Sequence, residues 1–488
     1  MPLMLKTKSS LYEVGYVVAN KDYLLNLEGL PTVRINDVIG GPNGALALVT
    51  SVSEEKVEAL LLNNKTIKPK DIFKIKEGGL TFPAGDSLLG RIFNPLAQPI
   101  DGKGYPRETK EVQIEIEQVA TGIATREKIN RQFITGMTVI DTLIPIGCGQ
   151  RELIFGEPRS GKTSFIFDLI LNQKNKGIIC IYVSIGKSEI EIKRLVKNLE
   201  LYETMPYSLI IAAFASDKAP LISLAPHVGF TVAEYFQMQG KDVVLILDDF
   251  SIHAKYLREI ALLSQKVPGR ESYPGDIFYQ QAHLMERAGN FNEQRGKGSI
   301  TLFPVIETNI ENFTNLIPTN VMASTDGHLF FSSTLSSQGQ YPSVDIDRSV
   351  TRVGRQTQNL LSQTISDKIR SLIVEYQELK NYSRFGSDLS TNTQLVLKRG
   401  SIAIELLKQE PLEKIEASIQ ILLLSVLFTP LATDNEREFI VANKNKIIEG
   451  LKTGEDFKDI IISLPKLDFN QLVSKMNEKL AIINSLCQ

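Results

Sequence analysis

One eight-residue segment constrains what this chain can fold into more than any other. It reads Gly156-Glu157-Pro158-Arg159-Ser160-Gly161-Lys162-Thr163 and matches the pattern GxxxxGK[ST]. In that pattern the backbone N–H groups of a loop surround phosphate oxygens, the lysine reaches the β- and γ-phosphates, and the final hydroxyl ligates Mg²⁺. An apolar strand is predicted just before the loop, at 152–155, and a helix just after it, at 164–171. The sequence therefore predicts a phosphate-binding site formed by Gly156, Arg159, Ser160, Gly161, Lys162, Thr163 and Ser164.

A second motif with a metal-binding character lies downstream. Five apolar residues, 243–247, lead into Asp248 and Asp249. Ligands bind at the carboxyl ends of strands in open α/β sheets, and in P-loop enzymes a carboxylate there helps to hold Mg²⁺. We therefore assign Asp248, together with Thr163, to Mg²⁺. The alternative is a structural capping role for Asp248.

Hydrophobic periodicity divides the chain into three regions. Short alternating runs separated by glycine and asparagine, at 12–18, 23–27, 33–39, 45–52 and 57–62, predict a small antiparallel barrel or sandwich. From about residue 136 to 354, apolar strands alternate with amphipathic helices, which predicts a parallel sheet covered by helices. Later segments have a helical period, at 365–382, 393–409, 412–428 and 435–451. We place the domain boundaries at 1–80, 81–364 and 365–488.

Composition excludes several functional classes. The 54 basic and 56 acidic side chains give a net charge of -2, which argues against a nucleic-acid-binding protein that relies on bulk positive charge. The longest apolar run, 417–428, is too short to cross a bilayer, so we expect no direct membrane insertion. Three cysteines are too few for a disulfide framework and fit a reducing cytoplasm.

Residues 267–279, VPGRESYPGDIFY, strongly resemble the α subunit of F-type ATP synthases. Other segments that are similar to landmarks of this family are 144–147, 149–153, 304–308, 317–321 and 385–389. The resemblance extends from about residue 11 to residue 450. It implies an α/β P-loop NTPase core with an N-terminal six-stranded β-barrel and a C-terminal α-helical domain.

The resemblance also implies a role and a set of partners. In this family three α and three catalytic β subunits alternate in a ring around a central rotor shaft, and only the β-side sites turn ATP over. An α-type chain binds ATP or ADP with Mg²⁺ without hydrolysing it, in a peripheral complex on the cytoplasmic side of the membrane. The resemblance does not assign the segment that contacts the stator, because the barrel pattern starts near Leu11 and the usual preceding helix is missing or reduced.

Lys187 is the departure from the family with the largest chemical consequence. It stands where catalytic β subunits have the glutamate that activates water and where typical α subunits have glutamine. An ammonium cannot accept a proton unless it is first deprotonated, so Lys187 favours a non-catalytic chain. Glu189 or Glu191 could substitute as a base, although a solvated helix face is the favoured interpretation for both. Lys187 could equally be a surface lysine on a rearranged loop.

The nucleotide site departs from the family at further positions. Pro158 and Arg159 replace the usual arginine and glutamine of the loop, which removes one backbone N–H and adds a forked cation. Tyr341 precedes proline where the family has arginine, and Pro411 replaces a second glutamine. Gln409 persists, and the resemblance implies that it binds nucleotide. Whether ATP, ADP or nothing occupies the site stays open.

Residues 342–352 resemble the segment that leads to the family's arginine finger. The motif register selects Arg352 rather than Arg348 or Arg355. A guanidinium that reaches across the interface can bind the charge that develops on a transferred phosphoryl group. The alternative is a structural ion pair of Arg352 with Asp345 or Asp347.

Other functional classes lead to different expectations. A self-sufficient hexameric ATPase of the export type would need a carboxylate base, and Lys187 argues against it. An RNA translocase resembling the terminator Rho would bind single strands through aromatic residues and a basic groove. Residues 11–62 offer Tyr12, Tyr16 and Tyr23 but little basic clustering. A variant F-type motor that drives something other than ion translocation also stays open.

Overall fold

The computed structural model describes residues 13–106, 112–116, 118–309, 312–382, 390–435 and 437–487. The chain forms two compact units, and both are discontinuous in sequence. The first unit comprises Met1–Thr121, Ile181–Gln239 and Leu245–Arg287, and the second comprises Gly122–Cys180, Gly240–Val244 and Ala288–Gln488. The family landmark at 385–389 and the expected start of the barrel at Leu11 lie outside the described residues.

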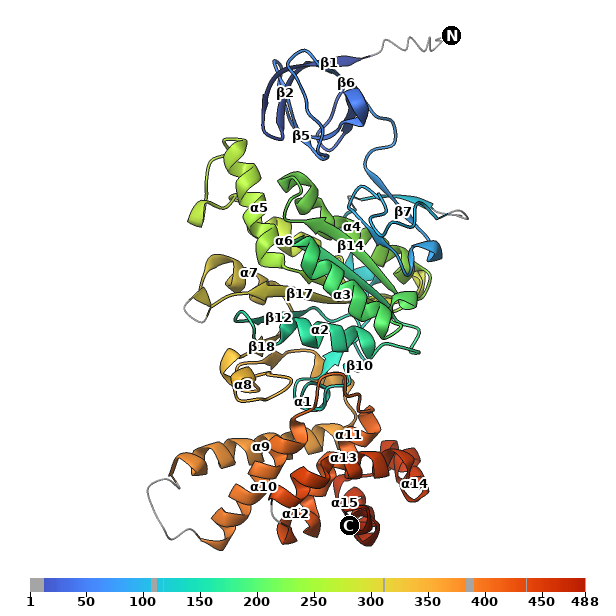
Figure 1. The fold of residues 1–488 in the computed structure, drawn as a ribbon, viewed down its shortest axis with the longest axis vertical. Helices are drawn as coiled ribbons and strands as arrows, with labels where there is room; N and C mark the ends of the chain where they lie inside the picture. Colours follow the sequence, from blue (N-terminus) through green and yellow to red (C-terminus); the bar gives the residue numbers. More distant parts are fainter. Residues whose placement is uncertain are drawn as a thin grey trace. The chain divides into compact units, whose positions relative to one another are not determined.

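The first unit begins with a closed six-stranded barrel (Figure 1). Its strands pair in the order β1-β2-β5-β4-β3-β6 and all neighbours are antiparallel. They are β1 (Val14–Lys21), β2 (Leu24–Gly29), β3 (Val38–Gly40), β4 (Leu46–Val52), β5 (Val57–Leu61) and β6 (Ile72–Ile75). The prediction of a barrel is confirmed. Of the predicted strand 33–39, only residues 38 and 39 belong to β3, and the closing strand β6 was not predicted.

The barrel is closed around apolar side chains that alternate along its strands. Phe73 of β6 is fully buried in this core. A Cβ at Gly41 would lie 2.4 Å from the Phe73 ring, so the ring requires glycine at that position. The hydroxyl of Tyr23 donates to Glu259 Oε1 at 2.9 Å, on helix α5 (Phe250–Leu263). The apolar side chains of Ile260 and Leu263, on the same helix, pack against the barrel core.

The rest of the first unit is an α/β layer. Its strands follow the order β15-β13-β14-β8, where β13 is Ile179–Lys187 and β15 is Val243–Asp248. Strand β14 (Ser208–Phe214) pairs in parallel with β8 (Ile92–Phe93), and β7 (Thr81–Ala84) pairs with β9 (Val112–Glu115). The other helices are α3 (Glu189–Leu201), α4 (Ala219–Met238) and α6 (Ile277–Met285).

The second unit has its own parallel strands. Strand β12 (Glu152–Gly156) is parallel to both β17 (Ser299–Glu307) and β18 (Gly327–Phe331). The order is β19-β18-β12-β17, with β19 at Val350–Thr351 and β16 (Gly289–Asn290) paired with β17. A two-stranded sheet joins β10 (Gln132–Phe133) and β11 (Ile146–Gly147). Its helices include α1 (Thr138–Leu143), α2 (Lys162–Leu171), α7 (Leu316–Ser324) and α8 (Ser333–Ser337).

From Leu360 onward the described chain is helical, as predicted (Figure 1). The helices are α9 (Leu360–Tyr382), α10 (Thr391–Leu407), α11 (Ala417–Ser425), α12 (Pro430–Asp434), α13 (Arg437–Thr453), α14 (Glu455–Ser463), α15 (Phe469–Glu478) and α16 (Leu480–Cys487). The predicted helix 412–428 starts only at Ala417, since Leu412 has a φ of 72° that a helix does not allow. Among the described residues, no helix is long and apolar enough to cross a membrane.

Candidate nucleotide site and arginine finger

The predicted phosphate loop lies in the second unit, between a buried parallel strand and a helix. Strand β12 ends at Gly156, where a Cβ would lie 2.1 Å from the Phe331 carbonyl oxygen, so the close approach of the two backbones requires glycine. Helix α2 begins at Lys162, preceded by Gly161 in a left-handed conformation with φ 91°. The first N–H groups of a helix have no partner within the helix and carry a partial positive charge. The loop therefore presents donors suited to an anion.

Lys162 adds a full positive charge to the loop. It is only 6% exposed, and its Nζ donates to the carbonyl oxygens of Gly156 and Glu157 at 3.0 and 2.6 Å. The same Nζ lies 3.5 Å from the carboxylate of Glu307 on β17. Thr163 and Ser164 are exposed at the first turn of α2, as is Arg159 in the loop. The P-loop pattern assigns Lys162 to phosphate and the Thr163 hydroxyl to the metal ion that accompanies it.

Segment 341–343 forms hydrogen bonds with the phosphate loop and with helix α2. The hydroxyl of Ser343 donates to the carbonyl of Ser160. The hydroxyl of Tyr341 donates to the carboxylate of Asp168 on α2, and the Leu412 N–H reaches the same carboxylate at 3.2 Å. Burial raises the pKa of Asp168, although the hydrogen bond from Tyr341 opposes this. Tyr341 is thus fixed against α2, a placement that the sequence did not predict.

Gln409 is buried and both ends of its amide are engaged. Its Nε2 donates to the Gly136 carbonyl at 2.9 Å, and its Oε1 accepts the Thr138 N–H. The side chain thus holds the segment that precedes and begins α1. Its role as a nucleotide ligand stays a prediction.

Asp248 ends β15 in the first unit and accepts two hydrogen bonds. Its Oδ2 lies 2.8 Å from the Lys187 Nζ and 2.7 Å from the Tyr182 hydroxyl. Burial alone would lower the pKa of Lys187, but the Asp248 carboxylate raises that pKa above its usual value. Lys187 is therefore a charged ammonium at neutral pH. Its side chain is only 19% exposed, so it is not the surface lysine of a rearranged loop.

The two glutamates considered as substitute bases have structural roles in α3. Glu191 forms a capping box with Ser188: its N–H donates to the Ser188 hydroxyl oxygen at 3.3 Å, and its carboxylate accepts the Ser188 N–H at 3.0 Å. The hydrogen bonds from Ser188 lower the pKa of Glu191. Glu189 is exposed and pairs with Lys193 one turn later, at 2.6 Å. Both glutamates lie on the exposed side of the helix, as the favoured interpretation expected.

The capping role considered for Asp248 belongs to its neighbour. The Oδ1 of Asp249 accepts the N–H groups of Ser251 and Ile252 at 2.6 and 3.3 Å and so caps α5. Burial, together with the charge of Asp248, raises the pKa of Asp249 to about 6. The two adjacent carboxyl groups therefore have different partners, one a helix terminus and the other a lysine.

Three neighbouring arginines have different surroundings in the second unit. Arg348 lies 3.7 Å from Asp345 and over the ring of Phe330, and Arg355 makes two hydrogen bonds of 2.7 Å with Asp367. Arg352 is exposed, and its guanidinium donates to the Thr325 carbonyl at 3.3 Å. Among the described residues, no carboxylate forms an ion pair with Arg352. The local pairing with Asp345 or Asp347 considered from the sequence is therefore not observed.

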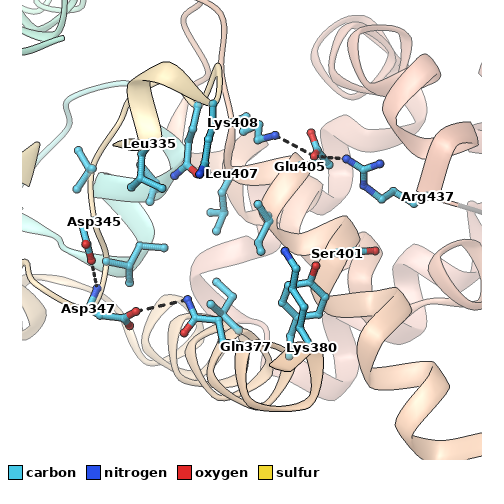
Figure 2. A pocket seen from close by; sticks show the side chains of 18 residues that line it. Leu335, Asp345, Asp347, Gln377, Lys380, Ser401, Glu405, Leu407, Lys408 and Arg437 are labelled. Carbon is cyan, nitrogen blue, oxygen red and sulfur yellow. Dashed lines mark hydrogen bonds and ion pairs between the residues drawn. The ribbon is translucent and has the colours of Figure 1, made fainter. Parts of the chain in front are cut away.

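A separate open cavity of about 610 Å³ lies in the second unit, between segment 335–347 and helices α9, α10 and α13. Figure 2 shows Glu405 between Lys408 and Arg437, and Asp347 hydrogen-bonded by Gln377. No residue of the phosphate loop lines this cavity.

A phosphate loop at the end of a parallel strand, in a chain with a closed barrel and a helical carboxyl-terminal part, defines a P-loop nucleotide-binding protein. The family model for the ATP synthase alpha/beta nucleotide-binding domain matches residues 136–351, and the model for the C-terminal domain of the same chains matches residues 356–480. The chain therefore belongs to the ATP synthase alpha/beta family.

Relatives in several bacteria support this membership. The chain is 37% identical to the ATP synthase subunit alpha of Metamycoplasma arthritidis, over 93% of this chain and 86% of the relative. It is 41% identical to the subunit alpha of Mycoplasma mycoides, over 84% and 78% of the two chains. For the subunit alpha of Petrotoga mobilis the identity is 36%, over 95% and 94%.

Proposed function

We propose that this chain is an α-type subunit in the soluble head of an F-type rotary ATP synthase or ATPase, and that it binds nucleotide without hydrolysing it. The pairing of Lys187 with Asp248 carries the proposal. Activation of the attacking water needs a group that can accept or orient its proton. An ammonium held by a carboxylate at 2.8 Å cannot do so, and Glu189 and Glu191 are engaged in α3.

The partners and the location follow from the family and from the names of the relatives. We propose that the chain alternates with catalytic β subunits in a three-plus-three ring around a central rotor shaft. The complex would be peripheral, on the cytoplasmic side of the membrane. We also propose that the chain divides into three domains, with boundaries after residues 80 and 364.

Arg352 is the residue through which we propose that this chain contributes to catalysis on a neighbouring subunit of the ring. Its guanidinium is exposed and pairs with no described carboxylate, whereas Arg348 and Arg355 are held by Asp345 and Asp367. A planar guanidinium without a carboxylate partner can bind two oxygens of a transferring phosphoryl group on a neighbouring subunit. Arg352 is thus the arginine of the three that is available to a partner.

Substitution Arg352→Lys in a reconstituted ring tests this role. Lysine keeps the charge but loses the planar fork, so ATP hydrolysis should slow by at least about 10² while assembly and nucleotide binding persist. The matched controls Arg348→Lys and Arg355→Lys should have milder effects on the rate. An unchanged rate in the Arg352→Lys ring, or a ring that does not assemble, would show that this arginine is structural.

Nucleotide binding to the isolated full chain is the second test. Lys162→Ala removes the cation that closes the phosphate loop, so the affinity for ATP and ADP should fall by at least about tenfold. Isothermal calorimetry measures this directly, and Lys193→Ala, on the exposed face of α3, serves as the control. Equal affinities of wild type and Lys162→Ala would contradict the assignment of the loop.

The two residues that the sequence assigns to Mg²⁺ differ in how well they fit a metal ion. The sequence assigns it to Thr163 and Asp248, and the exposed Thr163 hydroxyl fits the pattern. Asp248 fits poorly, because a carboxylate that would face a divalent ion is already paired with an ammonium. The proposed function therefore includes no step that depends on a metal ion.

A further inference from the structure

Arg151 and Asp326 form an ion pair beside the segment that carries Arg352. The Asp326 Oδ2 accepts the backbone N–H and the Nε–H of Arg151, both at 3.0 Å, and its Oδ1 accepts from the Arg151 Nη2 at 2.7 Å. The backbones are joined as well, because the Asp326 N–H donates to the Arg151 carbonyl at 2.8 Å. The side chains are 27% and 19% exposed. A forked arginine–carboxylate pair that is partly shielded from water is stronger than an exposed ion pair.

Arg352 is bonded to the same short segment through its backbone and through its side chain. Its N–H donates to the Asp326 carbonyl at 3.0 Å, and its Nη1 donates to the Thr325 carbonyl at 3.3 Å. The sheet brings these residues together. Arg151 and Asp326 directly precede the parallel neighbours β12 and β18, and Arg352 directly follows β19, which pairs with β18. The Arg352 guanidinium is therefore hydrogen-bonded to the residue that precedes Asp326.

An unpaired carboxylate at Asp326 would compete for this guanidinium. Opposite charges attract strongly at short range where little water screens them. In the structure both oxygens of Asp326 are engaged by Arg151. Glu152 lies in the field of Asp326 and Arg352, but burial raises the pKa of its carboxyl well above the usual value, which favours the neutral form. Asp326 is thus the charged carboxylate beside Arg352, and Arg151 is the cation that satisfies it.

We propose that Arg151 is a positioning residue for Arg352: it occupies the Asp326 carboxylate and so keeps the Arg352 guanidinium available to a phosphoryl group on a neighbouring subunit. The inference rests on the proposed function, since it requires that Arg352 acts there. Arg151 itself touches no phosphoryl group in this proposal. Without Arg151, a partly buried carboxylate would lack its cation, and Arg352 would be drawn to it.

The test measures ATP hydrolysis by rings reconstituted from this chain and the catalytic β partner. Arg151→Gln removes the cation but keeps a long polar side chain, so kcat should fall by at least about tenfold while KM for ATP stays within about twofold. Adding Asp326→Asn removes the competing carboxylate and should return kcat to within about threefold of the wild type. In the Arg352→Lys ring, Arg151→Gln should have little further effect, because the residue through which it acts is already impaired.

The matched control breaks a second forked pair in the same unit. Arg131 contacts both oxygens of Asp242 at 2.6 Å, so Arg131→Gln makes the same change of charge at a different place and should keep the wild-type rate. An equal loss of rate in this control would show a general effect of charge and would overturn the inference.

The remaining outcomes separate the inference from the proposed function. A wild-type rate in Arg151→Gln overturns the inference alone. A double variant that is no faster than Arg151→Gln, or that does not assemble, shows that the pair with Asp326 is only structural and also overturns it. If Arg151→Gln by itself does not assemble, the double variant decides: a rate near the wild type supports the inference, and a rate as low as that of Arg352→Lys overturns it. An unchanged rate in Arg352→Lys overturns the proposed role of Arg352 together with the inference.

Discussion

His253 is a buried histidine whose protonation is coupled to folding. It lies on α5, 2% exposed, with its ring stacked on Phe250 at 5.3 Å and its Nε2 3.1 Å from the Ser223 carbonyl oxygen. Burial lowers the pKa of His253 to about 4, and the hydrogen bond with Ser223 opposes this only partly. The folded chain therefore holds the neutral ring under conditions in which an exposed histidine would be charged.

The consequence is a loss of stability in mild acid. Between pH 6.5, the ordinary value, and about 4, the unfolded chain takes up a proton at this residue that the folded chain does not. Stability is thus fully present above pH 6.5 and is lost as the pH falls, by up to roughly 3 kcal/mol for this residue. Urea unfolding of His253→Gln, which keeps a donor but cannot titrate, should show a weaker pH dependence. Equal slopes in the wild type and in His253→Gln would contradict the prediction.

At the residue scale, the sequence allowed a specific prediction where a motif supplied a register. The pattern GxxxxGK[ST] selected the loop, and the register selected Arg352 among three arginines. The ion pairs that distinguish Arg348 and Arg355 from Arg352 depend on side-chain geometry, which no spacing reveals. Lys187 and Asp248 were both singled out, but for separate roles. Their pairing requires the neighbouring order of β13 and β15, which the sequence does not show.

At the scale of elements, the capping box of α3 links the position of Lys187 to helix formation. The Ser188 hydroxyl accepts the Glu191 N–H, which would otherwise have no partner in the first turn. Ser188→Ala should therefore lower the free energy of unfolding by about 1 kcal/mol, as chemical denaturation can measure. Ser371→Ala, at an exposed position inside α9, should change stability by only a few tenths of a kcal/mol. A Ser188→Ala variant as stable as wild type would show that the cap contributes nothing.

Strands and helices could be predicted from the sequence where the hydrophobic pattern was long, and less well where it was short. The barrel strands β1, β2, β4 and β5 coincide closely with alternating runs. Strand β6 spans only Ile72–Ile75, and a run of that length in a lysine-rich segment gives little period-two signal. The start of α11 was misplaced because apolar residues continue upstream of it, through the Leu412 turn. Helices α14, α15 and α16 lie largely beyond the last segment with a clear predicted period.

At the scale of the whole molecule, the sequence predicted the order of barrel, nucleotide-binding region and helices, because each has its own hydrophobic period. It did not predict that the compact units would be discontinuous, with 181–239 and 245–287 grouped with the barrel region. Periodicity reports on neighbours along the chain, whereas compactness depends on contacts between distant segments. The boundaries at 80 and 364 stay a prediction.

The purified chain should hydrolyse ATP at a negligible rate, because Lys187 is bound to Asp248 and neither Glu189 nor Glu191 is available as a base. A ring reconstituted with the catalytic β partner should be active under the same conditions. Phosphate release measures both rates, and Lys162→Ala identifies contamination, since trace activity from a contaminant would not respond to it. Turnover by the purified chain that Lys162→Ala abolishes would show that this subunit is itself a catalyst, and the non-hydrolysing role would have to be abandoned.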